Sequence, residues 1–346
     1  MKKIGILGHF AFGKETTSGQ IIKTKVVGNE LVQKFGENEV TRRDTSGGLL
    51  FLFIMPWIIL RLLIGHRNII IMPAHHGIRT IAPTLAVLNI FFHRKLHYIV
   101  IGSWLPELAT RSWAIRHCLS HFHGIYIETT SMQREMQELN VANVSVMPNF
   151  KALDIIGEDR LPTNSHPPYR LCTFSRVMRS KGIEDAVNAV NTYNQTAGST
   201  VFTLDIFGQI ENGEEKWFSE LMQAQQDNIR YKGIIAFDKS TEVLKDYDAL
   251  VFPTYYDGEG FAGTVIDAMS SGLPIIASDW HENPSIIDDG KTGLLFPTHS
   301  VQALVKILDE MAHDRLPIRE MRSNCLKEAR KYLPENVMKT LYDSLA

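Results

Sequence analysis

The segment that most constrains the fold of this chain is residues 253–278, which reads as a strand end, a glycine-rich acidic loop, a helix and a second strand. Gly258, Gly260 and Gly263 lie in the loop, where a residue without a side chain lets the backbone turn sharply and approach a ligand closely. The helix that follows exposes backbone amides at its N-terminus, and such an end binds a diphosphate. The segment therefore predicts an α/β architecture with a phosphate site beside a strand end.

Two acidic residues accompany this helix start. Glu259 lies just before the amides and could accept hydrogen bonds from sugar hydroxyls, whereas Asp267, two helical turns further on, could reach a ribose diol. An isolated acid near a helix start is more often explained by its favourable interaction with the helix dipole. The two acids together with the glycines indicate instead a site for a nucleotide sugar.

A second element, residues 174–182, is an apolar strand end followed by basic residues and a glycine that opens a helix. Arg176 and Lys181 lie five positions apart, with Arg179 between them. Basic loop residues are usually solvated surface charges. This element, however, precedes the acidic loop by roughly eighty residues of alternating strands and helices, and ligands of doubly wound sheets bind at the carboxyl ends of strands. Both elements are therefore expected to converge on one ligand.

These two elements resemble family 4 of the retaining GT-B glycosyltransferases. The family signature is a Glu in Glu-Gly-Phe-Gly and a second Glu eight positions later. Here Glu259 opens Glu-Gly-Phe-Ala, the shorter Asp267 stands at the second position, and Ala262 replaces a glycine. The resemblance is strongest over residues 170–296 and weaker before residue 150.

The resemblance implies that the chain transfers a sugar from a nucleotide sugar to an acceptor hydroxyl with retention of configuration. Glu259 would orient the sugar, Arg176 and Lys181 would stabilise the leaving diphosphate, and the donor phosphate would help to deprotonate the nucleophile. No metal or other cofactor is expected, and UDP is favoured over GDP. The remaining residues expected in the donor site are Gly260, Phe261, Ala262, Gly263, Thr264, Asp267 and Gly13.

Length and charge predict two domains, because 346 residues are more than one hydrophobic core usually holds. Residues 1–150 carry 16 Lys and Arg against 9 Asp and Glu, and residues 151–346 carry 20 against 29, so the net charges are +7 and −9. We expect the GT-B arrangement of two Rossmann-like domains facing across a cleft. Residues 1–150 would bind the acceptor, residues 151–330 the donor, and a helix over residues 331–346 would cross back to the first domain.

The hydrophobic pattern indicates where elements begin and end. In the first half, strands are expected at residues 3–7, 68–72, 97–101, 124–127 and 144–147, with a helix at 20–35. Closing helices are expected at residues 299–313, 317–331 and 334–346.

Histidines of the first half are candidates for contact with the acceptor or the reacting sugar. His75 and His76 follow an expected strand end, and His9 follows the first strand. Histidines chosen by position alone are more often packing or surface residues. His117 and His121 have the helical spacing of metal ligands, but they lack a nearby acid, so a metal site is not favoured.

Two other motifs resemble known ligand-binding motifs only superficially. The loop from Gly8 to Gly13 has P-loop spacing, but Glu15 follows Lys14 where the motif needs a magnesium-binding Ser or Thr. The acids Asp246 and Asp248 imitate a metal-binding Asp-x-Asp motif, yet they enter a strand and so lie at the wrong end for a ligand.

Residues 49–64 are apolar except for Pro56 and Arg61, too short a run to span a bilayer. We expect a core helix, with membrane docking as the alternative. The N-terminus lacks a signal-peptide pattern, and three widely spaced cysteines give no disulfide framework, so we expect a cytoplasmic protein.

The basic first half favours a lipid-diphosphate-linked glycan or a growing surface polysaccharide as acceptor. Peripheral contact with the anionic inner face of the cell membrane is an open possibility, and nucleic acid is not expected. Two alternatives remain for the function. One is a non-catalytic GT-B subunit that stabilises a partner transferase, and the other is a nucleotide-sugar epimerase.

Overall fold

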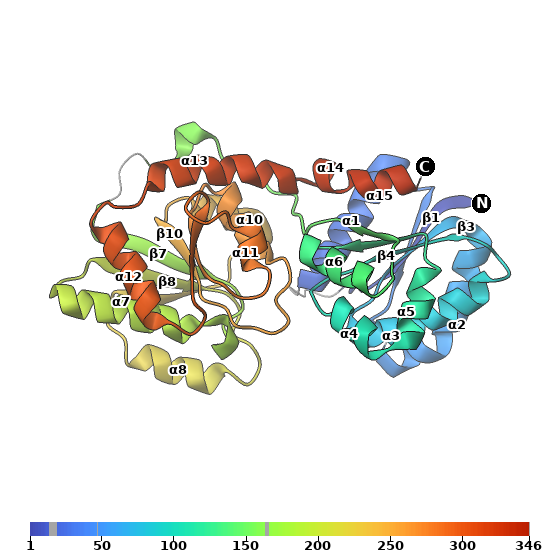
Figure 1. The fold of residues 1–346 in the computed structure, drawn as a ribbon, viewed down its shortest axis with the longest axis horizontal. Helices are drawn as coiled ribbons and strands as arrows, with labels where there is room; N and C mark the ends of the chain where they lie inside the picture. Colours follow the sequence, from blue (N-terminus) through green and yellow to red (C-terminus); the bar gives the residue numbers. More distant parts are fainter. Residues whose placement is uncertain (14–18, 47, 163–165, 346) are drawn as a thin grey trace. The chain divides into compact units, whose positions relative to one another are not determined.

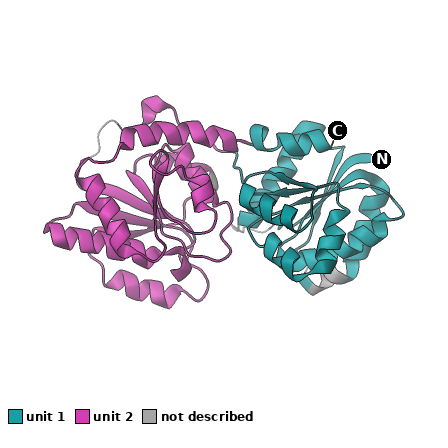
Figure 2. Ribbon diagram, viewed as in Figure 1, with its two compact units in different colours: residues 1–152, 334–346 teal, residues 153–333 magenta. Residues whose placement is uncertain are grey.

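The computed structural model describes residues 1–13, 19–46, 48–162 and 166–345. The chain divides into two compact units, shown in different colours in Figure 2. Unit 1 comprises Met1–Ala152 with Pro334–Ala346, and unit 2 comprises Leu153–Leu333. Each unit is built on a six-stranded sheet flanked by helices (Figure 1).

The sheet of unit 1 has the order β2-β1-β3-β4-β5-β6, and all of its strand pairs are parallel. Its strands are β1 (Lys2–Gly8), β2 (Val40–Asp44), β3 (His66–Met72), β4 (Lys95–Ile99), β5 (Gly124–Ile127) and β6 (Val144–Val146). Its helices are α1 (Gly19–Phe35), α2 (Gly48–Gly65), α3 (His75–Asn89), α4 (Leu105–Arg111), α5 (Trp113–Ser120), α6 (Thr130–Glu138), α14 (Pro334–Val337) and α15 (Lys339–Ser344).

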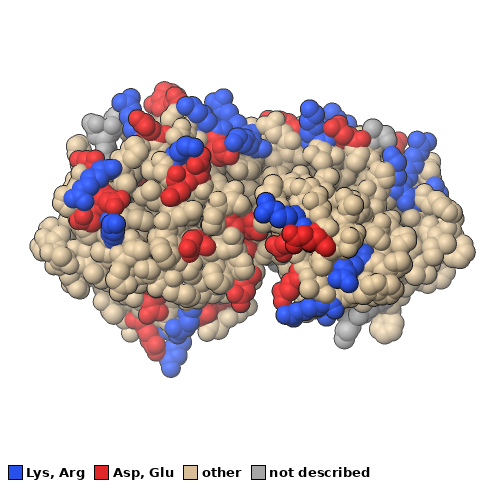
Figure 3. All heavy atoms as spheres, in the orientation of Figure 1, with Lys and Arg blue, Asp and Glu red and all other residues tan. Residues whose placement is uncertain are grey.

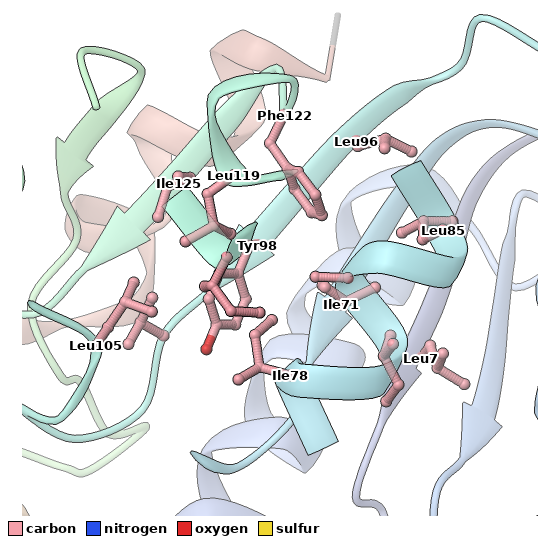
Figure 4. Close-up of a cluster of buried hydrophobic side chains, with 14 of the residues drawn as sticks. Leu7, Ile71, Ile78, Leu85, Leu96, Tyr98, Leu105, Leu119, Phe122 and Ile125 are labelled. Carbon is pink, nitrogen blue, oxygen red and sulfur yellow. The ribbon is translucent and has the colours of Figure 1, made fainter. Parts of the chain in front are cut away.

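The β3 strand explains why both faces of this sheet are covered by helices. Ile69 and Ile71 point into a core shared with α2, α3 and α5, whereas Ile70 points into a second core shared with α1 and α15. Alternate residues of a strand face opposite sides, so an unbroken apolar run buries both faces. Figure 4 shows part of the first core, with Ile71 beside Ile78 of α3.

The sheet of unit 2 has the order β12-β11-β10-β7-β8-β9 and is also parallel throughout. Its strands are β7 (Tyr169–Phe174), β8 (Phe202–Phe207), β9 (Ile229–Gly233), β10 (Ala249–Phe252), β11 (Ile275–Ser278) and β12 (Gly293–Phe296). Its α-helices are α7 (Ile183–Ala197), α8 (Glu215–Gln223), α9 (Ser240–Leu244), α10 (Gly263–Ser270), α11 (Asn283–Ile286), α12 (Val301–Ala312) and α13 (Ile318–Ala329). Short 3-10 turns lie at Glu158–Arg160, Arg179–Lys181, Phe237–Lys239 and Arg330–Tyr332.

The last residues of the chain pack on unit 1. Met338, Leu341 and Leu345 are buried in the same core as Ile4 of β1, and Ser344 is hydrogen-bonded to Tyr126 of β5 at 2.5 Å. The expected single helix over residues 334–346 is instead two short helices, α14 and α15. The expected strand at 97–101 also lies two residues earlier, as β4.

Helix α2 occupies the apolar run at residues 49–64, for which a core helix was expected. One face is buried, through Phe51, Met55 and Ile59, but Phe53 and Trp57 are exposed. The prediction of a core helix is therefore correct for one face only. No helix within the described residues has the length and hydropathy needed to cross a membrane.

Candidate nucleotide-sugar site

The site is built where β7 and β10, neighbours at the centre of the unit 2 sheet, reach their carboxyl ends. The basic element follows β7 and contains the turn Arg179–Lys181, and the acidic loop follows β10 and leads into α10. The Thr264 hydroxyl in the first turn of α10 donates a hydrogen bond to the Phe174 carbonyl at the end of β7. This bond fixes the start of α10 beside the basic element.

Lys181 and Glu259, the central residues of the two elements, form a buried ion pair between Nζ and Oε2. The Thr254 hydroxyl donates to the same carboxylate oxygen at 2.9 Å. Burial lowers the pKa of Lys181, and the neighbouring Glu259 carboxylate opposes that shift. The predicted convergence of the two elements is thus present as a direct contact between residues far apart in the chain.

Arg176 lies near the same pair but is half exposed. Its Nη1 donates to Glu211 Oε2 at 2.7 Å, and its guanidinium lies 5.4 Å from the centre of the Tyr256 ring. The Lys181 ammonium lies 4.9 Å from the centre of that ring. Two cations therefore share one aromatic side chain, an arrangement that favours binding of a polyanion such as a diphosphate.

Arg179 belongs to a different set of contacts. Its Nε lies 3.5 Å from Glu214 Oε2, and its guanidinium lies over the ring of Trp217 at 4.9 Å. The structure therefore separates Arg179 from the contacts that join Arg176 and Lys181.

The start of α10 leaves its backbone amides without a capping side chain from the N-cap residue. That residue is Ala262, whose methyl group cannot accept the hydrogen bonds that a Ser, Thr or Asp would accept. The side chains of Phe261 and Ala262 are buried in the unit 2 core. Only the backbone amides between Gly260 and Gly263 could therefore contact a donor, and this contact stays a prediction.

Asp267 is fully buried within α10. Its Oδ1 accepts a hydrogen bond from Ser240 Oγ at 2.8 Å, at the beginning of α9. The expected contact with a ribose stays a prediction. Ser240 was not predicted as a partner, because nothing in the motif spacing indicates which residue of a distant segment lies against position 267.

The candidates in unit 1 lie at the carboxyl edge of its own sheet. Gly13 has φ +75° and is followed by residues 14–18, which lie outside the described residues. His9 follows β1, and His75 and His76 open α3 with their rings 5.0 Å apart. Burial, assisted by the charge of Arg79, lowers the pKa of His75. Their contact with acceptor or sugar stays a prediction.

The acids and histidines discounted above have structural contacts. Asp248 accepts a hydrogen bond from the Arg170 amide at 2.7 Å and lies 3.6 Å from the buried Arg322, and the His117 ring stacks on Trp113. Within the ranges described, no three His, Cys, Asp or Glu side chains are placed to hold a metal ion.

Comparison with known proteins assigns the family. The family model for glycosyl transferases group 1 matches residues 158–332, which contain both halves of the Lys181–Glu259 site. The chain belongs to the group 1 glycosyltransferases.

Curated relatives of this group 1 glycosyltransferase share part of its length. The GtfA subunit of the UDP-N-acetylglucosamine–peptide N-acetylglucosaminyltransferase of Streptococcus gordonii is 29% identical over 223 residues, 61% of this chain and 42% of that protein. The amylovoran biosynthesis glycosyltransferase AmsK of Erwinia amylovora is 25% identical over 179 residues, 50% of this chain and 41% of that protein. The chain thus matches less than half the length of these relatives.

Solved structures resemble the group 1 glycosyltransferase over its whole length. Anabaena HepE in complex with UDP has a TM-score of 0.76 at 15% identity, covering 100% of this chain and 99% of its own. Sucrose-phosphate synthase of Thermosynechococcus elongatus has a TM-score of 0.77 at 15% identity with the same coverage. Together with the two parallel sheets, these similarities confirm the predicted GT-B fold.

Three site residues were not identified from the sequence. Thr254 and Tyr256 lie within residues 253–278, but their contacts are visible only in the structure. Thr254 contacts Glu259, and Tyr256 contacts the cations Arg176 and Lys181. Glu211 lies in the loop after β8, and no motif distinguishes it from other surface acids.

Proposed function

We propose that the protein transfers a sugar, a hexosyl or N-acetylhexosaminyl group, from a UDP-sugar to an acceptor hydroxyl with retention of configuration, as family 4 enzymes do. The observation that carries the proposal is the Lys181–Glu259 pair beside Arg176, at the strand ends next to the start of α10. Solved neighbours bound to UDP and UDP-glucose support a uridine nucleotide as donor.

In this proposal each group has a definite part. Arg176, Lys181 and the first amides of α10 bind the diphosphate and stabilise the charge that develops as the bond from the sugar to the phosphate oxygen breaks. Glu259 orients Lys181 and the sugar. The acceptor oxygen forms the new bond and its proton passes to the leaving phosphate, so no carboxylate base is required. Arg176, Lys181 and the α10 amides supply the charge stabilisation that a metal would otherwise give.

A glycan or lipid-linked glycan is the acceptor we propose, and the setting is surface polysaccharide synthesis at the cytoplasmic side of a membrane. Relatives in amylovoran biosynthesis and, as a putative assignment, in colanic acid biosynthesis support this choice. The GtfA likeness favours a second candidate, a peptide acceptor within a complex of two subunits. A non-catalytic subunit is less well supported, because Arg176, Lys181 and Glu259 are all present.

The proposed function is tested by incubating the protein with UDP-glucose, UDP-N-acetylglucosamine and GDP-mannose, with lipid-linked glycan or peptide as acceptor. The expected result is release of UDP and an acceptor product whose anomeric configuration, read by NMR, equals that of the donor. An inverted product would contradict the mechanism. A changed nucleotide sugar formed without acceptor would identify an epimerase.

Glu211 is expected to compete with the donor for Arg176. The pair that it forms is partly exposed, and a diphosphate must displace the carboxylate and overcome its repulsion. Replacing Glu211 by Gln is expected to tighten UDP binding about fivefold, measured by calorimetry. Glu214→Gln is the matched control, since Glu214 pairs with Arg179, and it should leave the affinity unchanged. Unaltered or weaker binding by Glu211→Gln would rule out the competition.

A further inference from the structure

Helix α2 presents an apolar face that the described residues of unit 1 leave exposed. Phe53 is 81% exposed and Trp57 is 68% exposed, and Ile54 and Ile64 are exposed on the same helix. Arg61 is the charged residue among them. Large aromatic side chains are rarely left in water on neighbouring turns of one helix, and a contiguous apolar surface of this kind marks an interaction site.

The apolar surface continues onto the end of α3. Phe91 is 79% exposed, and Val87 and Ile90 are exposed beside it. The Nε of Arg94 donates to the Leu63 carbonyl at 2.9 Å, which ties the turn after α3 to the end of α2. We call the exposed apolar residues of α2, of the end of α3 and of the turn after α3 the α2–α3 surface: Phe53, Ile54, Trp57, Ile64, Val87, Ile90 and Phe91.

A basic cavity adjoins this surface at the amino ends of the strands. Its volume is about 670 Å³, and Arg94, which bonds to the end of α2, is part of its wall. Four further basic or titratable side chains line it, those of Lys3, Arg67, His93 and Lys95, against one acid, Glu39. The Glu39 carboxylate already accepts a hydrogen bond from the Lys3 amide at 2.8 Å, so the cavity suits an anion.

We propose that the α2–α3 surface and the adjoining basic cavity bind an anionic lipid bilayer. Tryptophan and phenylalanine enter the boundary between headgroups and acyl chains, and the cavity binds the phosphate of an anionic headgroup. Charge complementarity favours a bilayer over a second protein, because residues 1–150 carry 16 basic against 9 acidic residues. Figure 3 shows one face of the molecule with its charged side chains coloured. The inference goes beyond the proposed function and does not depend on it.

The test is co-sedimentation of the full chain with vesicles of phosphatidylcholine, with or without phosphatidylglycerol. The protein is expected to bind the anionic vesicles and to bind the neutral ones more weakly. The variant F53S/W57S/F91S should lose binding about tenfold or more, and R67E/K95E should lose the preference for anionic vesicles.

Two variants in unit 2 serve as matched controls. Ile234 is 61% exposed and Lys216 is exposed on α8, so I234S and K216E should bind vesicles like the wild type. UDP titration and thermal unfolding should be unchanged in all variants, which shows that they fold.

Wild-type protein that does not sediment with anionic vesicles would overturn the inference, and so would wild-type binding by F53S/W57S/F91S. Conversion from a dimer to a monomer in that variant, without any lipid binding by the wild type, would assign the surface to a second copy of the chain. Vesicle binding needs no sugar donor, so its failure is distinguishable from a failure of the proposed transferase activity.

Discussion

Replacing Glu259 by Gln is expected to lower turnover about a hundredfold or more and to destabilise unit 2 by about 3 kcal/mol. The carboxylate is buried and pairs with the buried Lys181, and it also accepts the Thr254 hydroxyl bond. Removing its charge leaves the buried Lys181 ammonium without its paired carboxylate. The same ammonium would then be less well placed to stabilise the leaving diphosphate.

Turnover is measured by UDP release with the best donor, and the free energy of unfolding is measured by chemical unfolding. Asp257→Asn is the matched control, because Asp257 is an exposed acid of the same loop and should change neither quantity appreciably. A Glu259→Gln protein with wild-type turnover would refute the catalytic role of the pair. Wild-type stability would refute the structural part of the argument.

Replacing Gly182 by Ala is expected to cost about 4 kcal/mol or more and to abolish nucleotide binding. Gly182 has φ +69°, and an added Cβ would lie 2.0 Å from the Pro253 carbonyl oxygen. Because Gly182 follows Lys181 and Pro253 precedes Thr254, relief of this overlap displaces either Lys181 or the segment that contacts Glu259.

Gly198 provides a matched control at the other end of α7. It has φ +67°, but an added Cβ would have no atom within 4 Å. Gly198→Ala should therefore cost only about 1 kcal/mol, the strain of a left-handed backbone, and should bind UDP normally. The stabilities of the two variants are compared by urea unfolding, and their affinities for UDP by titration. Equal effects at the two positions would contradict the role of the close approach to Pro253.

The parallel sheets were predictable because strands such as β3 and β10 carry unbroken apolar runs. The edge strand β2 was not predicted, since Val40–Asp44 contains two arginines and an aspartate and only Val40 is buried. An edge strand pairs on one side alone, so its sequence needs little apolar character. The division of the last segment into α14 and α15 likewise reflects packing on unit 1 and not a local sequence signal.

Part of the site was predictable, because the residue types and the order of the strands along the chain both indicated it. Lys181 and Glu259 belong to elements that end neighbouring strands, so their convergence followed from the topology of a parallel sheet. The partners Ser240, at the beginning of α9, and Glu211, in the loop after β8, come from other segments, whose positions depend on tertiary packing that motif spacing does not indicate. The exposure of one side of α2 could not be predicted from the sequence either, because both faces of the helix are apolar.

The central claim is that Arg176 and Lys181 form a nucleotide diphosphate site. Calorimetric titration of UDP, GDP and CMP against the wild type and Arg176→Ala tests it most directly. Arg179→Ala is the control, because Arg179 is a similarly exposed arginine of the same loop that contacts Glu214 and Trp217 instead. We expect UDP to bind the wild type and Arg179→Ala, and we expect Arg176→Ala to lose about tenfold or more in affinity for UDP. Absence of binding by every nucleotide, or equal affinity of Arg176→Ala and wild type, would contradict it.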